Sequence, residues 1–423
     1  ENIEFKKYYT LKFDGKYFHK SEDELIDILD TKLQKAVKRQ MLSDVPIGFF
    51  LSGGLDSSLI VAIAKKINPK LNLECFTIDD NNFKEGFVKD IYYAKKVAKY
   101  LNVNLNVIKS EFDIVNEFDK MIWHLDEPQA DPAPLHVFNI SLLAKKKGIK
   151  VLLGGTGGDD IFSGYRRHKA LNFEKIINFL PKFILLLIKK TLSIITFNTP
   201  FIRRLKKLIK NIDKTIEERI VGYFGWLKLK KIRKLLINKD DIKNYNPYHY
   251  LFKLLNEIPK EKSYLNKILF LEQNTFLPDH NLNYTDKMSM ATGIETRVPF
   301  LDIELIDFSK KIPPNLKMKG KETKYILKKV AERYLPKDII YRSKTGFGAP
   351  VRKWILKDMS KFIDKRLSNK KVIDQRIFNY NELKDLIKKN KNGKIDASYS
   401  IWSILAINSW FNQFVNQNLL NDK

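Results

Sequence analysis

An apolar run at residues 47–51 is followed at once by Ser52, Gly53 and Gly54, and then by a helical pattern of apolar residues. The run predicts a buried strand, and the spacing after residue 55 predicts a helix. Glycines let backbone amides approach an anion closely, and the first amides of a helix point toward it. A strand, a glycine turn and a helix N-terminus in this order predict a phosphate-binding loop in an α/β fold.

The loop differs from the Walker motif because no Lys follows its glycines. Its charged side chain is Asp56, in the predicted first turn of the helix, with Ser57 and Ser58 beside it. A carboxylate next to a bound polyphosphate suggests a bridging Mg²⁺ ion. The motif resembles that of the PP-loop ATP pyrophosphatases, S-G-G-x-D-S, a superfamily that cleaves ATP between its α and β phosphates.

A second strand runs into glycines at residues 150–158, where Gly154, Gly155 and Thr156 precede Asp159 and Asp160. Between the two loops, apolar strands alternate with amphipathic helices, which predicts a parallel sheet covered on both faces. The predicted strands are 73–79, 104–109 and 150–153, and the predicted helices are 87–101, 111–123 and 134–147. Because both glycine loops follow strands, they should meet at the carboxyl edge of the sheet, with Asp159 opposite Asp56 as a second Mg²⁺ ligand.

The chain divides by pattern into four parts. Residues 1–20 resemble a linker, residues 21–167 the nucleotide-binding core, residues 168–270 a helical basic insertion, and residues 271–423 a helical remainder of the same domain. Ser21 and Glu24 form a capping-box pattern for a helix that extends to about residue 42. The apolar, basic segment 179–210 has runs too short to span a bilayer, and we expect a helical hairpin packed on the catalytic lobe.

Composition restricts the function further. The formal net charge is +28, but the excess is mainly Lys and is spread along the chain, so we expect neither a specific nucleic-acid partner nor membrane contact. The single cysteine, Cys75, excludes a disulfide framework and lies in a predicted core strand. No secretory signal pattern is visible, and a cytoplasmic location is expected.

Further motifs narrow the resemblance to the synthetase domain of the asparagine synthetase family. The chain has Asp126-Glu127-Pro128 between the two loops, and a G-x-G-x-D-D-x-F-x-G-Y pattern at 155–165. Downstream it has D-K-M-S-M at 286–290, E-T-R-V-P-F-L-D at 295–302 and R-S-K-T-G-F at 342–347. Residues 401–411 resemble the closing helix of the family, so the resemblance covers residues 21–412.

The resemblance implies an ATP-dependent ligase that forms carbon–nitrogen bonds. Its cofactors would be ATP and Mg²⁺, with the metal on Asp56 and Asp159. Lys344 would stabilise charge on the α-phosphate, and Thr156 would lie where the acyl-adenylate meets ammonia. The predicted nucleotide-binding residues are Leu51, Ser52, Gly53, Gly54, Asp56, Ser57, Ser58, Ile78, Gly154 and Gly155. We interpret Arg297 and Asp302 as a structural ion pair, and Asp126, Glu127, Asp286 and Lys287 as structural or substrate-binding alternatives.

One position departs from the family pattern G-E-G-x-D-E. Thr156 replaces the first Glu of the loop, and Asp160 replaces the last. A neutral Thr cannot act as the same acid or base, so the chain either amidates aspartate with altered contacts or amidates another carboxylate, such as a sugar acid. Glu1 stands where a catalytic glutaminase cysteine would be needed, so ammonia is expected from a glutaminase domain upstream or from a partner.

The leading prediction is the synthetase domain of a glutamine-hydrolysing asparagine synthase. It would adenylate the aspartate side chain, release pyrophosphate and let ammonia displace AMP to give asparagine. A homodimer is a candidate assembly. The alternatives are an amidotransferase of the same family acting on another carboxylate, a PP-loop tRNA-modifying enzyme, which the basic charge favours, and a non-catalytic homologue, for which Thr156 is the only support.

Overall fold

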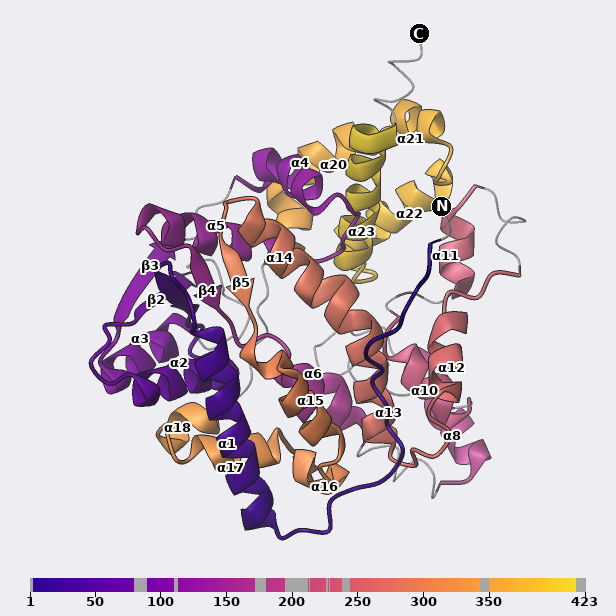
Figure 1. Cartoon of the computed structure of the whole chain (residues 1–423). Coiled ribbons are helices and arrows are strands. Elements are labelled where there is room, and N and C mark those ends of the chain that lie inside the picture. Colours follow the sequence, from indigo (N-terminus) through magenta and orange to yellow (C-terminus); the bar gives the residue numbers. More distant parts are fainter. Residues whose placement is uncertain are drawn as a thin grey trace.

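A five-stranded parallel sheet forms the centre of the computed structural model, which describes residues 3–79, 90–109, 113–171, 180–194, 212, 214–225, 227, 229–237, 244–342 and 350–415 (Figure 1). The strand order is β3-β2-β1-β4-β5, and all neighbours are parallel. The strands are β1 (Ile47–Phe50), β2 (Glu74–Asp79), β3 (Asn104–Lys109), β4 (Val151–Leu153) and β5 (Glu295–Arg297). The predicted α/β class with a largely helical C-terminal extension is confirmed.

Helices cover both faces of this sheet. One layer contains α1 (Glu22–Gln40), α2 (Leu55–Ile67) and α3 (Asp90–Leu101), and the other contains α5 (Ala133–Lys146) and α14 (Asn283–Met290). Cys75 in β2 is fully buried, as predicted, and burial raises the pKa of its thiol. α1 begins with the predicted capping box, in which Ser21 and Glu24 bond each other's backbone amides, and it ends at Gln40 rather than at residue 42.

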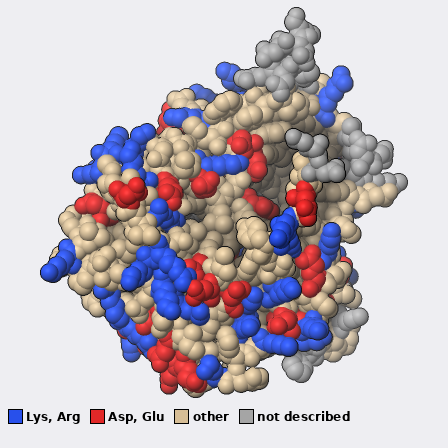
Figure 2. Space-filling view, in the orientation of Figure 1, with Lys and Arg blue, Asp and Glu red and all other residues tan. Residues whose placement is uncertain are grey.

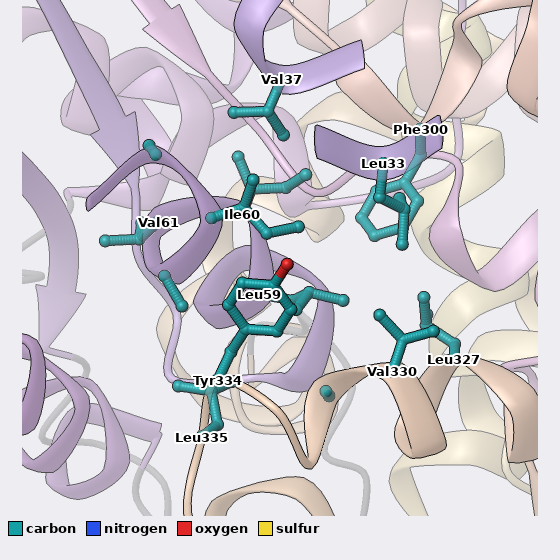
Figure 3. Close-up of a cluster of buried hydrophobic side chains, with 14 of the residues drawn as sticks. Leu33, Val37, Leu59, Ile60, Val61, Phe300, Leu327, Val330, Tyr334 and Leu335 are labelled. Carbon is teal, nitrogen blue, oxygen red and sulfur yellow. The ribbon is translucent and has the colours of Figure 1, made fainter. Parts of the chain in front are cut away.

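The first helical layer is completed by residues from far along the chain. Leu33 and Val37 of α1 and Leu59 and Ile60 of α2 share one buried cluster with side chains from the second half of the chain (Figure 3). These later side chains include Phe300, Leu327, Val330, Tyr334 and Leu335. Burial of each such side chain contributes about 1.5–3 kcal/mol, so the C-terminal part is an integral part of the core.

In the described part of residues 271–423, three short strands lie among the helices. β5 extends the sheet beside β4, and Met318–Lys319 (β6) pairs with Glu322–Thr323 (β7) in a small hairpin. β5 has only three residues, too few for an apolar run or an alternating pattern to identify a strand.

Two helical clusters flank the sheet. The first includes α4 (Ile114–Leu125) and α23 (Ser398–Trp410), and the second includes α10 (Ile216–Gly222), α12 (His249–Asn256) and α13 (Tyr264–Leu271). The remaining elements are α6 (Gly158–Phe162), α8 (Lys182–Ile194), α11 (Leu229–Leu235), η1 (Glu272–Leu282, a π-helix), η2 (Pro299–Leu301), α15 (Ile303–Lys310), α16 (Pro314–Lys317), α17 (Tyr325–Ala331), α18 (Lys337–Ile340), α19 (Val351–Lys353), η3 (Trp354–Asp358), α20 (Ser360–Arg366), α21 (Asn369–Gln375), α22 (Tyr380–Lys391) and η4 (Phe411–Val415).

The N-terminal segment lies in extended form across the second helical cluster. Phe13 is buried against Phe270, and its ring faces the ammonium of Lys317 at 5.5 Å. Lys317 is 1 % exposed and donates a hydrogen bond to Asn266 Oδ1 at 3.0 Å. Burial lowers the pKa of Lys317 to about 7, although the charge of Glu261 favours the protonated form.

We expect this lysine to make stability rise with pH. The folded pKa lies below the value of about 10.4 in an unfolded chain, so the unfolded state binds more protons between about pH 7 and pH 10. Lys317→Met should remove that slope, because Met binds no proton in either state. Urea unfolding at both ends of this window measures the effect, with the exposed Lys321→Met as control. An identical slope in wild type and Lys317→Met would contradict it.

Candidate active site

The two glycine loops leave the sheet side by side. β1 and β4 are neighbours, with Phe49 opposite Leu153, and each strand ends in its glycine loop at the same edge. On one side of β1 lie β2 and β3, and on the other lie β4 and β5, so the connections change direction between β1 and β4. In open parallel sheets, this switch point is where ligands bind, outside the carboxyl ends of the strands.

The first loop is held in shape by its own serines. Ser57 Oγ accepts a hydrogen bond from the Ser52 amide at 3.2 Å and lies 3.0 Å from Ser52 Oγ. Ser52 Oγ in turn accepts one from the Gly54 amide at 3.3 Å. α2 then begins after Gly54 without a side-chain cap, so its N-terminus is suited to an anion.

The second loop packs directly on Asp56. A Cβ atom on Gly158 would lie 2.8 Å from Asp56 Cγ, so only glycine allows this approach. Gly164 has the same role at the end of the loop, since a Cβ there would lie 1.7 Å from Asp159 Oδ1. The Gly154 amide donates to the carbonyl of Arg297 at 2.8 Å, which ties the loop to β5. Asp56 and Asp159 are thereby brought to one point, as predicted.

A lysine that the sequence analysis did not identify lies between these carboxylates. Lys324 Nζ contacts Asp56 Oδ2 and lies 2.5 Å from Asp159 Oδ1. Lys324 is 6 % exposed and has a left-handed backbone, with φ of 57°. Burial opposes its charged form, but the charges of Asp159 and Asp56 outweigh that effect, and its pKa is raised.

The donor set fits a hydrated cation that also binds phosphate. Two carboxylates already converge on a single positive charge, and their side chains are 18 % and 22 % exposed. Within the described ranges, no group of three or more His, Cys, Asp or Glu side chains could hold a metal. Mg²⁺ is usually bound by one or two carboxylates together with phosphate oxygens and water, and the side chains of Asp56 and Asp159 fit that ligand set.

Removing Lys324 should destabilise the ligand-free protein. In Lys324→Met, the carboxylates of Asp56 and Asp159 would face each other without a neutralising charge, and loss of one partner from a buried ion pair costs about 3–5 kcal/mol. Thermal or urea unfolding measures this loss, and added Mg²⁺ should recover part of it. Lys321→Met, an exposed change three residues upstream, should alter stability by about 0.5 kcal/mol or less. Equal effects of the two substitutions would exclude the interaction.

The predicted site residues fall into two groups by exposure. Those that are partly open toward the carboxyl edge of the sheet are Ser52, Gly54, Asp56, Ile78, Gly155, Thr156 and Asp159. Those that are buried are Leu51, Gly53, Ser57, Ser58 and Gly154. Leu51 and Ser58 are 0 % exposed, so both support the loop from within the core rather than presenting a side chain to it. The predicted contacts of these buried residues with the nucleotide stay predictions.

Lys344 lies outside the described residues, but Arg342 of the same motif is well placed. Its guanidinium is packed on the Tyr93 ring, and Nη1 donates to Asp90 Oδ1 at 2.8 Å. Nη2 would lie 3.6 Å from a Cβ atom on Gly54. Arg342 therefore lies beside the first glycine loop.

The other motif residues have structural partners. Lys287 contacts the Asp126 carboxylate and donates to the Leu125 carbonyl at 2.8 Å, where Asp126 ends α4 in a left-handed conformation. Arg297 and Asp302 do not pair with each other, which corrects the predicted ion pair. Arg297 bonds Glu295 at 2.7 Å, and Asp302 accepts from Arg39 at 2.9 Å. Their sequence proximity was misleading because β5 and η2 direct the two side chains to different neighbours.

A buried polar network supports the second loop from behind. Tyr165 Oη donates to both oxygens of Asp160 at 3.1 Å and accepts from Asn281 Nδ2 at 2.8 Å. Burial and the charges of Glu272 and Asp159 raise the pKa of Asp160 well above its ordinary value. His168 Nε2 lies 2.9 Å from both oxygens of Glu272. Asn281 and Glu272 belong to η1, and π-helices of this kind often occur at functional sites.

A cavity of about 440 Å³ lies between α14 and the end of β5, the strand that neighbours β4. Figure 2 shows a hollow near the middle of the face that it draws, with acidic and basic side chains around it. The cavity is lined by Pro278, Leu282, Asn283, Thr285, Asp286, Lys287, Thr296 and Val298. Thr296 Oγ1 is buried without a hydrogen-bond partner. Its position beside Arg297, which holds Gly154, connects the cavity to the second loop.

These features define an α/β protein with two glycine loops and an uncapped helix N-terminus at the switch point of its sheet, an arrangement suited to nucleotide phosphates. Comparison with known proteins identifies the family: residues 29–412 match the family model described as asparagine synthase. The chain belongs to the asparagine synthase family.

Individual relatives agree. The chain is 32 % identical to asparagine synthetase [glutamine-hydrolyzing] 1 of Bacillus subtilis over 97 % of its length and 62 % of that protein. It is 24 % identical to the amidase chyE of Penicillium rubens, over 84 % of the chain and 57 % of the relative. Among solved structures, the U34-tRNA thiolase NcsA of Methanococcus maripaludis matches with a TM-score of 0.26 and 12 % identity, covering 80 % and 87 % of the two chains. The chain thus spans 62 % of the first of these relatives and 57 % of the second, less than two thirds of either.

Proposed function

We propose that this chain is the synthetase part of an ATP-dependent amide-forming ligase, with aspartate as the first candidate substrate. An oxygen of the substrate carboxylate attacks the α-phosphorus of ATP, the bond to the β-phosphate breaks, and pyrophosphate leaves. Ammonia then attacks the acyl carbon and loses a proton, and AMP leaves with one oxygen of the original carboxylate. The observation that carries this proposal is the convergence of the Asp56 and Asp159 carboxylates on the ammonium of Lys324, between the two glycine loops.

Each loop has a separate task in this scheme. Ser52, Gly53, Gly54 and Ser57 hold the pyrophosphate end through backbone amides and hydroxyls, and the N-terminus of α2 favours its charge. Asp56 and Asp159 would hold Mg²⁺, which supplies positive charge to the phosphates when it is bound. Lys324 would then leave the two carboxylates and place its ammonium beside the phosphate oxygens. Gly154, Gly155 and Ile78 would border the adenosine, and Lys344 would offset charge on the α-phosphate.

The cavity beside the second loop is the natural place for the acyl substrate. It contains apolar walls, from Leu282 and Val298, and polar groups, from Asn283 and Thr296, which suits a small molecule with several polar atoms. Thr156 belongs to the second loop, and it provides a hydroxyl where the family has a carboxylate. The fungal relative named an amidase shows that members of similar sequence have different names, so a carboxylate other than aspartate is the second candidate.

Thr296 should contribute to binding of the acid but not of ATP. The buried hydroxyl of Thr296 has no hydrogen-bond partner and can form a hydrogen bond with a polar atom of the substrate. Leaving a buried polar group without such a bond costs about 1–3 kcal/mol. We expect Thr296→Val to raise KM for the acid by about tenfold and to leave KM for ATP within about twofold. Initial-rate kinetics with each substrate varied in turn measures the split. Thr31→Val, on the exposed face of α1, is the control, and an equal rise in both KM values would exclude a substrate contact.

The proposal is tested by carboxylate-dependent exchange of labelled pyrophosphate into ATP with Mg²⁺. Aspartate is assayed first, followed by a panel of uronic and amino acids. Exchange with aspartate supports an asparagine synthase, and exchange with another acid alone keeps the mechanism and replaces the substrate. Absence of exchange with every acid, in protein shown to bind ATP, would reject the ligase assignment.

A further inference from the structure

The peripheral amphipathic helix α8 exposes large apolar side chains to water. α8 lies far from the sheet at the edge of the molecule (Figure 1). Its exposed positions are 183, 186, 187, 190 and 191, the spacing of one helical face. Three of the five are large and apolar, since Phe183 is 71 %, Leu186 51 % and Leu187 61 % exposed. A helix that only faced water would carry polar side chains there.

The other face of α8 already has its partners. Leu185 is 6 % exposed and packs with Ile212, while Ile188 and Leu192 lie against the same small cluster. The exposed stripe is therefore additional to the face that anchors the helix. Thr191 adds no unmet hydroxyl to the stripe, because Oγ1 donates to the carbonyls of Leu187 and Ile188 at 3.1 and 3.0 Å.

The sequence that contains α8 carries charge of one sign. Lys190 continues the exposed face by one turn, and Lys189 lies next to it. In the sequence from 175 to 212 there is no Asp or Glu, and the basic residues are Lys175, Lys182, Lys189, Lys190, Arg203, Arg204, Lys206, Lys207 and Lys210. Elsewhere the chain mixes both signs, as the total of 49 Asp and Glu shows.

We propose that α8 docks on the surface of an anionic phospholipid bilayer, with Phe183, Leu186 and Leu187 inserted among the acyl chains and Lys189 and Lys190 at the headgroups. Apolar side chains on one face with Lys beside them are the features of helices that lie in the membrane interface. Within the described part of the chain, no helix is long and apolar enough to cross a membrane, so α8 would lie on the bilayer. The second half of the expected helical hairpin, residues 195–210, lies outside the described residues, so that expectation stays a prediction.

Lipid fits this surface better than nucleic acid does. Proteins that bind single-stranded RNA stack bases on aromatic side chains, and the exposed stripe contains one aromatic ring beside two leucines. Leucines gain free energy by entering hydrocarbon, whereas RNA gives them no apolar partner. The basic residues would serve either ligand, so the aliphatic part of the stripe decides between them.

Vesicle co-sedimentation of the full chain tests the proposal. Binding to phosphatidylcholine vesicles containing phosphatidylglycerol is expected, with weak binding to phosphatidylcholine alone and a decrease at high salt. Phe183→Ser/Leu187→Ser should lose affinity by about tenfold or more. Ile303→Ser, which changes an apolar residue on α15 that is 56 % exposed, should bind as wild type. Pyrophosphate exchange should be unchanged in all three proteins, which shows that each is folded.

Site-specific fluorescence locates the inserted residues independently. Cys75 is the single cysteine and is 0 % exposed, so an environment-sensitive dye attached at Leu187→Cys labels only α8. The dye should shift to the blue on anionic vesicles, and the same dye at Ile303→Cys should not. Wild type that fails to bind anionic vesicles overturns the proposal. Loss of self-association in Phe183→Ser/Leu187→Ser, without any vesicle binding by wild type, would instead assign the stripe to a second copy of the chain.

Discussion

Replacing Asp56 by Asn should lower carboxylate-dependent pyrophosphate exchange by roughly a thousandfold or more, because metal-ion stabilisation of phosphate charge contributes several kcal/mol to the transition state. The substitution keeps the shape of the Asp56 side chain and removes its negative charge, which together with that of Asp159 contacts Lys324. Rates should also lose most of their dependence on Mg²⁺ concentration. Steady-state exchange assays over a range of Mg²⁺ concentrations measure both effects.

A double substitution tests whether the two carboxylates act together. If Asp56 and Asp159 hold one ion, Asp56→Asn/Asp159→Asn should cost little more than either single change, whereas independent roles would give additive losses. Asp44→Asn is the matched control, because this exposed carboxylate precedes the opposite end of β1. Full additivity of the two losses would separate the carboxylates and contradict a shared ion.

Lys344→Met should reduce kcat by about a hundred- to a thousandfold, the typical loss when one preorganised group that stabilises transition-state charge is removed. KM for ATP and for the acid should change little, because the ammonium is proposed to act on charge that develops at the α-phosphate. The position of Arg342 beside Gly54 supports this role, since the motif begins at the edge of the site. Full kinetic analysis of the variant separates kcat from KM.

Lys357→Met provides the comparison for this lysine. Lys357 is exposed in η3, shortly after the segment that contains Lys344, and it should tolerate the change with activity within about twofold of wild type. A Lys344→Met enzyme with normal kcat would remove this residue from the mechanism. A rise in KM for ATP alone would limit its role to nucleotide binding.

The main features of the site could be predicted because they are local. Each glycine loop is a contiguous strand, turn and helix start, and the parallel pattern of the sheet is enough to place the ends of β1 and β4 together. Asp56 and Asp159 follow directly from that arrangement, although about a hundred residues separate them. The capping box of α1 could also be predicted from local sequence, since Ser21 and Glu24 lie three residues apart.

Features that depend on long-range packing could not be predicted in the same way. Lys324 is one of 77 basic residues, and nothing near it in sequence distinguishes it from the exposed lysines, until folding places it between two loops formed far earlier in the chain. η1 was indistinguishable from an ordinary helix, because apolar spacing does not reveal a wider turn. The predicted pairing of Arg297 with Asp302 was wrong because the partner of each residue depends on how β5 and η2 lie against α1 and the segment after it.

The most direct measurement of the central claim uses substrate labelled with ¹⁸O in its carboxylate. The protein is incubated with ATP, Mg²⁺, ammonia and the acid that supports exchange, and the AMP is analysed by mass spectrometry. The proposed mechanism transfers one labelled oxygen to the phosphate of each AMP formed. Unlabelled AMP, or release of ADP and phosphate, would show that the carboxylate does not attack the α-phosphorus and would contradict the account.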